Sequence, residues 1–245
     1  MFIKFLLIFL IGIPTIFCAK LPDYIKPCKL DDANLNSCAY NNAKAAIPRI
    51  AQGDPKYNLP SLSPLHIHQI TLGGSRSLNL SLSHVDIIGI PDVDLQTLGI
   101  TFNDSIYRLT ASANVPKLNV KGDYKINGRI LILPITGNGP ANINLDDVFF
   151  EVEYDLKPET KNSKEYLKLV NDNIEMKVKH VTFKFENLFN GDKRLSAEMD
   201  KFIANNSQEI FNELKPAIIE VIKTVCLSIL KGITNKVPLD ELFVK

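Results

Sequence analysis

The amino-acid sequence predicts an α+β fold: a strongly curved antiparallel β-sheet wrapped around one long C-terminal α-helix, with a short helix near the N-terminus. The long helix is predicted because apolar residues recur every three or four positions from Leu195 to Ile233. The sheet is predicted because apolar and polar residues alternate in several earlier segments. A continuous helix from Leu195 to Thr234 would be about 60 Å long, against a diameter of roughly 45 Å for a spherical domain of this size. The sheet must therefore curl along the helix.

The chain begins with the features of a secretory signal peptide. Lys4 precedes an apolar run from Phe5 to Phe17, and Cys18-Ala19 offers small residues for cleavage. The run is shorter than the ~20 residues that a membrane span needs. We therefore expect residues 1–19 to be removed, with cleavage after Cys18 as the alternative. Residues 20–245 are expected to form a single, secreted, extracellular domain without a stable membrane anchor.

Three cysteines would remain after cleavage, namely Cys28, Cys38 and Cys226. Cys28 and Cys38 flank a short polar segment, and a disulfide between them would fix the entry of the chain into its first helix. Closing a ring of about ten residues stabilises a fold by roughly 2.5–3 kcal/mol in the chain-entropy treatment. Cys226 occupies a helical position, and we expect it to be a free, buried thiol. An intermolecular disulfide at Cys226 is the alternative.

The strands are predicted from an alternation with a period of two. Leu78–Ser83 is the clearest case, and further series begin at Tyr107, Ile174 and Val181. Ile130–Leu133 is apolar at every position, which is typical of a strand covered on both faces. Turn residues separate these segments. The expected turns are Gly73-Gly74, Gly89-Ile90-Pro91, Gly122-Asp123, Asn127-Gly128, Gly137-Asn138-Gly139-Pro140 and Asn190-Gly191.

Pro216 lies within the predicted long helix. A proline removes one helical hydrogen bond and clashes with the carbonyl group four residues earlier, here that of Asn212. The apolar stripe nevertheless resumes at Ile218 and Val221. We therefore expect the helix to bend at Pro216 without ending.

Charge and motifs exclude several classes of function. Without Lys4, the 28 basic residues become 27 and balance the 27 acidic ones, so neither nucleic acid nor an anionic membrane is an expected partner. His66 and His68 have no further ligands nearby in sequence, so no metal site is predicted. The segment Gly73–Ser77 lacks the closing glycine of a nucleophile elbow. The sequence thus predicts neither an enzyme nor a cofactor.

Four segments, in this order, resemble the insect juvenile-hormone-binding and takeout-like protein family. They are Cys28 with Leu35–Cys38, then Gly89–Asp92, then Val115–Gly137, and finally Leu188–Asp192 continuing through Phe211–Pro216 to Val237–Phe243. The resemblance spans nearly the whole mature chain. It implies a tubular lipid-binding fold in which the sheet and the long helix enclose an apolar tunnel.

The chain departs from the family pattern at three positions. Family members commonly carry Trp where this chain has Ser207, and often an aromatic residue where it has Leu239. Hormone-binding members from moths carry a second disulfide, for which Cys226 has no partner. The resemblance is therefore closer to the takeout-like branch.

The resemblance implies that one elongated apolar ligand lies between the helix and the inner face of the sheet. The ligand would be a juvenile-hormone-like terpenoid, a fatty acid or a related lipid, carried by a monomer. We expect the lining residues to be Phe202, Ile203, Ile210, Leu214, Ile218 and Val221 from the helix, with Ile132, Phe149 and Phe183 from strands. The helix residues share one stripe, whereas alternation does not determine which strand face is lined. The alternatives are a secreted signalling protein that binds a protein partner in feeding or daily rhythm, and a protein that engages lipid membranes.

Three Asn-x-Ser sequons begin at Asn79, Asn103 and Asn205. We expect glycosylation first at Asn103, which lies in a polar loop. Asn79 should point away from the apolar face of its strand. Asn205 should lie opposite the helix stripe.

Overall fold

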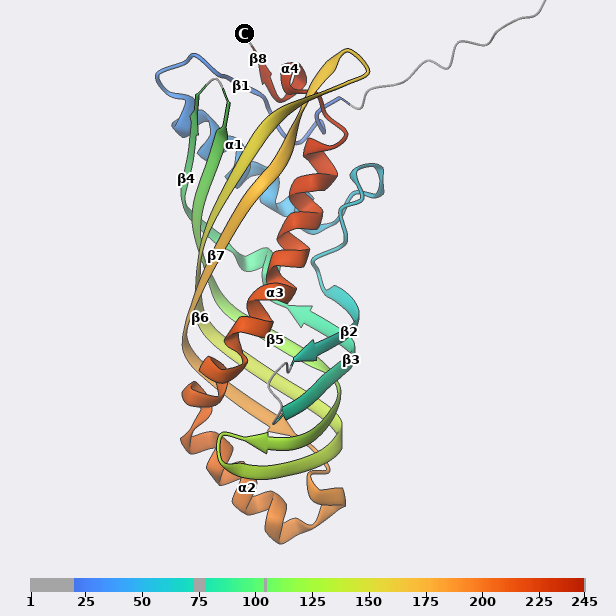
Figure 1. Ribbon diagram of the computed structural model, residues 1–245. Coiled ribbons are helices and arrows are strands. Elements are labelled where there is room, and N and C mark those ends of the chain that lie inside the picture. Colours follow the sequence, from blue (N-terminus) through green and yellow to red (C-terminus); the bar gives the residue numbers. More distant parts are fainter. Residues whose placement is uncertain (1–19, 73–77, 104, 245) are drawn as a thin grey trace, which may run out of the picture.

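The computed structural model describes residues 20–72, 78–103 and 105–244. The expected signal peptide and the turn at Gly73-Gly74 lie outside these residues. Within them, a strongly curved antiparallel sheet wraps around the long helix α3, with the short helix α1 beside the strand β4 (Figure 1). The predicted fold class is therefore confirmed.

The main elements are α1 (Leu35–Ala51), β2 (Leu65–Leu72), β3 (Leu78–Ile88), β4 (Asp94–Phe102), β5 (Tyr107–Ile130), β6 (Leu133–Lys161), β7 (Lys164–Phe185), α2 (Lys193–Asn205) and α3 (Ser207–Thr234). Short elements complete the chain: β1 (Cys28–Lys29), η1 (Pro55–Tyr57), η2 (Ile90–Asp92), η3 (Phe189–Gly191), α4 (Leu239–Leu242) and β8 (Phe243–Val244).

Six strands form the main sheet in the order β2-β3-β5-β6-β7, and β4 also pairs with β5. β4 pairs with the first half of β5 and β3 with the second half, so the two short strands follow one another along the same edge. β5, β6 and β7 contain 24, 29 and 22 residues, which is four to five times the usual strand length. These three strands run the length of the molecule beside α3 (Figure 1).

An irregularity crosses the three long strands at one level. In each strand, two successive buried residues lie three positions apart instead of two. The pairs are Val115 and Leu118, Leu145 and Val148, and Val178 and Val181. Val148 pairs with both Val115 and Val178, so the irregularities lie side by side. The extra residue reverses which alternate positions face inward, and the two apolar series expected at Ile174 and Val181 therefore belong to one strand.

Several expected turns lie inside strands. Gly122-Asp123 and Asn127-Gly128 belong to β5, and Gly137–Pro140 belongs to β6. A Cβ atom at Gly137 would lie 2.7 Å from the hydroxyl oxygen of Tyr124 and 3.0 Å from the Cα atom of Leu188. Glycine within a strand often marks a place where neighbouring segments approach closely, and Gly137 has this role instead of forming a turn.

Conversely, the segment Ile130–Leu133 is a hairpin turn, so the prediction of a doubly covered strand was wrong. Ile130 pairs with Leu133, and Leu131 has a left-handed φ of 51°. Ile132 is 80% exposed at the tip of the turn. Leu131 and Leu133 pack against the core, which explains why the turn is apolar.

The single long helix was also predicted incorrectly at one point, because α2 and α3 are separate helices. Asn206 lies between them with φ −121° and ψ 21°. Its side-chain amide donates a hydrogen bond of 2.7 Å to the backbone carbonyl of Phe202. Short polar side chains that bond to the backbone in this way compete with helical hydrogen bonds. α3 is about 42 Å long at 1.5 Å per residue, and it continues through Pro216 as predicted.

The two ends of the described chain meet at one end of the molecule (Figure 1). The predicted disulfide joins Cys28 in β1 to Cys38 in α1, with 6.0 Å between the Cα atoms. β1 in turn pairs with β8 in parallel, Cys28 opposite Phe243. The opposite end of the molecule is formed by α2 (Figure 1).

Candidate functional site

A cavity of about 340 Å³ lies between α3 and the inner face of the sheet. Strands β2, β3, β5, β6 and β7 contribute side chains to it, and α3 contributes residues from Phe211 to Ile229. This stretch of helix spans about 27 Å at 1.5 Å per residue. All the lining residues are uncharged and apolar, and the sulfur atoms of Met176 and Cys226 are the only side-chain heteroatoms among them.

The burial of α3 changes along its apolar stripe. Phe211 and Leu214 are 1% and 5% exposed, whereas Ile218 and Val221 are only partly buried although they also face the sheet. All four residues line the cavity, which leaves a gap between α3 and the strands. A close-packed core would leave no such gap.

Four of the nine residues predicted to line a tunnel do line the cavity. These are Leu214, Ile218, Val221 and Phe183. Phe202, Ile203 and Ile210 do not: they pack into the main core beside the break between α2 and α3, where Ile203 and Ile210 are 2% and 1% exposed. Direct contact of any of these residues with a ligand stays a prediction.

Ile132 and Phe149 are placed away from the cavity, so their selection requires correction. Ile132 lies at the exposed hairpin tip between β5 and β6. Phe149 follows the irregularity in β6, where Val148 takes the inward position and is 0% exposed. The ring of Phe149 is turned toward Lys177, whose Nζ atom lies 5.8 Å from the ring centre.

Sequence reasoning missed Tyr154, the one buried residue with an unsatisfied side-chain polar atom among the described residues. Tyr154 lies on β6 and is 5% exposed, and its hydroxyl group has no hydrogen-bond partner there. The thiol of Cys226 lies beside it without the geometry of a hydrogen bond. Burial, with smaller effects from Cys226 and Asp172, raises the pKa of Tyr154, so the phenol is protonated at neutral pH. The sequence signal was a tyrosine in an inward-facing apolar series, between Val152 and Leu156.

Cys226 is a free thiol, as predicted, and is partly buried. Burial raises its pKa, so it is protonated at neutral pH. Cys226 lines the cavity and also packs against a second apolar cluster at one end of it. We call this group, formed by Tyr154, Leu156 and Leu167, the end cluster. Its cover includes residues of α4 and β8, namely Leu239, Leu242 and Phe243.

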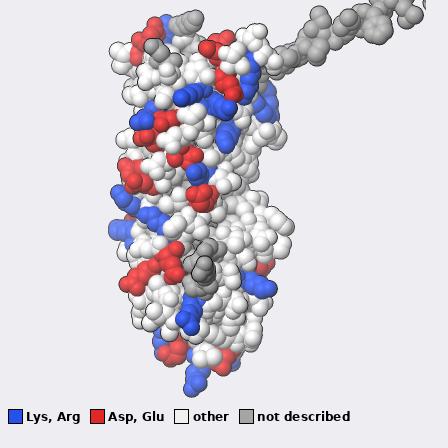
Figure 2. All heavy atoms as spheres, in the orientation of Figure 1, with Lys and Arg blue, Asp and Glu red and all other residues white. Residues whose placement is uncertain are grey.

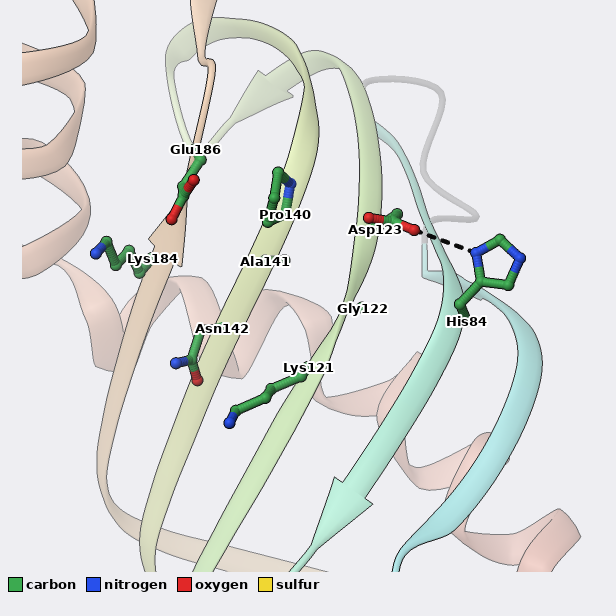
Figure 3. Close-up of a pocket in the computed structure, with 9 residues that line it drawn as sticks. All are labelled: His84, Lys121, Gly122, Asp123, Pro140, Ala141, Asn142, Lys184 and Glu186. Atoms are coloured by element: carbon green, nitrogen blue, oxygen red, sulfur yellow. Dashed lines mark hydrogen bonds and ion pairs between the residues drawn. The ribbon is translucent and has the colours of Figure 1, made fainter.

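A second hollow, of about 380 Å³, lies on the outer face of the sheet and is polar. Lys121, Asn142 and Lys184 lie opposite one another on β5, β6 and β7, and Asp123 accepts a hydrogen bond of 3.1 Å from His84 (Figure 3). Basic and acidic side chains alternate around this open hollow. Such an arrangement is typical of a solvated sheet surface and does not select a ligand of one charge.

The remaining surface also carries no strong signal. Basic and acidic side chains are interspersed on the face shown in Figure 2, without a large patch of either sign. His66 pairs with Asp86, and no group of three or more potential metal ligands occurs in the described parts of the chain. Within the same residues, no helix is both long and apolar enough to cross a membrane.

The three sequon asparagines are exposed. Asn79 lies on β3 opposite Asn127, and Asn205 is the last residue of α2. The side-chain oxygen of Asn103 accepts hydrogen bonds from the backbone amides of Ser105 and Ile106, at 2.9 and 2.8 Å. Glycosylation at these sites stays a prediction.

Comparisons with known proteins agree with this architecture. The circadian clock-controlled protein daywake of Drosophila melanogaster is 26% identical over 233 residues, covering 91% of this chain and 88% of the relative. The daywake protein of Drosophila yakuba is 25% identical over 231 residues, with the same coverage. The crystal structure of Takeout 1 from Epiphyas postvittana covers 90% of this chain and 100% of its own, with a TM-score of 0.79 and 22% identity, and so shows the same fold.

The family model that matches the chain describes haemolymph juvenile hormone binding proteins, and the match extends over residues 5–244. Proteins of this family bind hydrophobic ligands and are carriers, not enzymes. The apolar cavity, the takeout-like fold and the match over nearly the whole sequence lead to one conclusion: the chain belongs to the haemolymph juvenile hormone binding protein family, with takeout-like relatives.

Proposed function

We propose that this protein is a secreted carrier that holds one apolar small molecule in the cavity between α3 and the sheet. The observation that carries the proposal is the cavity itself, about 340 Å³ in volume and lined by uncharged apolar residues. This volume falls within the ~300–1,000 Å³ that is usual for small-molecule sites. The apolar run from Phe5 to Phe17 supports secretion.

The carrier acts by equilibrium burial. Transfer of apolar ligand surface from water into the cavity supplies the driving force. For a ligand of about 20 heavy atoms at roughly 0.4 kcal/mol per atom, the binding free energy is near 8 kcal/mol, which corresponds to a micromolar Kd. The ligand is then shielded from water and from hydrolytic enzymes while it is bound.

Tyr154 and the uncharged lining together favour a neutral ligand with one oxygen acceptor. The protonated Tyr154 hydroxyl is buried beside Cys226 and can donate a hydrogen bond to a carbonyl, ester or ether oxygen. A free fatty acid would instead bury its carboxylate among residues that carry no positive charge. Burial of an unpaired charge is costly, so esters, ketones and related neutral lipids should bind more tightly than fatty acids.

The test is mass spectrometry of organic extracts from the natively purified protein, followed by competition measurements. The neutral fluorescent probe N-phenyl-1-naphthylamine should bind, and a long-chain methyl ester should displace it at lower concentration than the fatty acid of equal length. Absence of both extractable lipid and probe binding in correctly folded protein would refute the carrier function. Stronger displacement by the fatty acid would refute only the preference for a neutral ligand.

A further inference from the structure

The last six described residues, 239–244, cover the end cluster, and we call them the C-terminal strap. The preceding residue pair fixes its start, because Val237 is 0% exposed and Pro238 is also buried. Beyond Pro238 the burial falls: α4 and β8 contain no fully buried side chain, and Val244 is 39% exposed. The strap is therefore anchored at one end and loosely packed along the rest of its length.

The strap lies over the end cluster, and the end cluster adjoins the cavity. Leu239, Leu242 and Phe243 of the strap are partly buried and pack against the end cluster. Cys226 connects the two regions, because it packs against the end cluster and lines the cavity. No strap residue lines the cavity itself. At this end, the end cluster, which contains the Tyr154 hydroxyl without a hydrogen-bond partner, lies between the strap and Cys226 of the cavity lining.

The contacts that hold the strap closed are few, while the frame beneath it is fixed. β8 pairs with β1 over two residues in a two-stranded sheet, and the next amide, of Leu30, reaches the carbonyl of Val244 at 3.4 Å. The ring of Phe243 stacks on Tyr107 with 6.1 Å between the ring centres. β1 itself is tied to α1 by the disulfide, and Cys28 is only 6% exposed.

We propose that the C-terminal strap is the movable closure through which the ligand enters and leaves, and that β1 is the fixed frame on which it closes. The inference rests on the proposed carrier function. Segments with few buried apolar contacts open at a lower free energy than the rest of a domain. Opening at Pro238 would uncover the end cluster without unfolding α3 or the long strands. The oxygen of an entering ligand would then reach the Tyr154 hydroxyl close to the opening.

The substitution Phe243→Ala tests the proposal through binding kinetics. It removes the ring stack on Tyr107 but changes no cavity-lining residue. We expect the association and dissociation rate constants of N-phenyl-1-naphthylamine, measured by stopped-flow fluorescence, to rise by the same factor of about five. This factor corresponds to a loss of about 1 kcal/mol in the stability of the closed strap relative to the open one. Because both rate constants rise together, the Kd should stay within about twofold of the wild-type value.

The matched control is Leu195→Ala, which removes an apolar side chain that is 44% exposed on α2, at the opposite end of the molecule (Figure 1). It should leave both rate constants unchanged. A chain that ends at Pro238 provides a second variant and should exchange the probe faster still. In the wild-type protein, amides of residues 239–244 should exchange with deuterium well before those of α3.

Three outcomes would overturn the proposal. Unchanged rate constants in both strap variants would show that the ligand uses another route. A raised Kd with an unchanged association rate constant would show that Phe243 holds the ligand directly instead of closing the cavity. Failure of the wild-type protein to bind the probe would overturn the carrier function as well, and is thereby distinguished from a failure of the closure alone.

Discussion

Replacement of Tyr154 by phenylalanine should stabilise the protein while weakening its binding of oxygen-bearing ligands. The ring stays in the end cluster, and only the hydroxyl group without a hydrogen-bond partner is lost. An unsatisfied buried hydroxyl costs about 1–3 kcal/mol. We expect a gain of about 1 kcal/mol, at the low end, because the polarisable sulfur of Cys226 beside the hydroxyl offsets part of this cost without forming a hydrogen bond. For a domain of this size, the gain raises the Tm by roughly 2–4 °C.

The same substitution should lower affinity only for ligands that accept a hydrogen bond. A neutral hydrogen bond contributes about 0.5–1.5 kcal/mol net, so the Kd of a methyl ketone should rise roughly 2- to 13-fold. The Kd of the alkane of equal length should not change. Thermal melts without ligand and displacement of N-phenyl-1-naphthylamine by the two compounds measure these effects.

Two results would refute this reasoning. A lower Tm for Tyr154→Phe would show that the hydroxyl is already satisfied in the unliganded protein. An equal loss of affinity for the ketone and the alkane would show that the substitution changes the shape of the cavity and that the hydroxyl does not contact the ligand.

Three further predictions concern other parts of the molecule. Leu214→Trp should raise the Kd of the probe at least about tenfold with little loss of Tm, because the cavity can hold the larger side chain. The control Leu80→Trp, in the packed core, should lower the Tm sharply, and an equal loss of stability in both variants would place Leu214 in ordinary core. Thiol titration should give almost no signal in the native protein and one thiol per chain after denaturation without reductant, since Cys226 is free with a raised pKa and Cys28 and Cys38 are bonded; three thiols would contradict this pairing. Hydrogen bonds from Lys161 and Lys168 lower the pKa of Glu159 from 4.5 to about 2, so its contribution to stability is present above pH 4.5 and lost as the pH falls toward 2. The free energy of urea unfolding of Glu159→Gln should therefore differ from that of the wild type at pH 6 and converge with it near pH 2. A difference that does not depend on pH would refute the assignment.

The sequence predicts the fold class because the helical and the strand periodicity of its apolar residues each extend over long segments. The stripe from Leu195 to Ile233 remains apolar across the break, so it does not reveal that Asn206 ends a helix. At that break the side chain of Asn206 donates a hydrogen bond to the carbonyl of Phe202, which periodicity does not encode. In the same way, Gly137 signals a turn in sequence but permits a close approach inside β6.

The cavity is predictable only in part: three of the six residues chosen on the helix line it, and so does Phe183, one of the three chosen on strands. Leu214, Ile218 and Val221 share one helical stripe, and all three line the cavity. On a strand, one extra residue exchanges the two faces. The irregularity beside Asp147, whose φ is 51°, turns Val148 inward and Phe149 outward, and the alternation of apolar residues alone does not reveal it. Tyr154 was missed because its importance depends on the absence of a partner, which only the packing defines.

The pairing of β1 with β8 has a consequence for biosynthesis. Cys28 and Phe243 are paired although they lie 215 positions apart, so Phe243 is translated long after Cys28. Contacts between such distant residues form slowly, because a long loop must close before they can stabilise the fold. The sheet and α3 can therefore assemble before the strap is in place, and a newly made chain passes through an open state. Under the proposed carrier function, a ligand present in the compartment of synthesis would be enclosed at that stage, and the first cargo would be set by the cell that makes the protein.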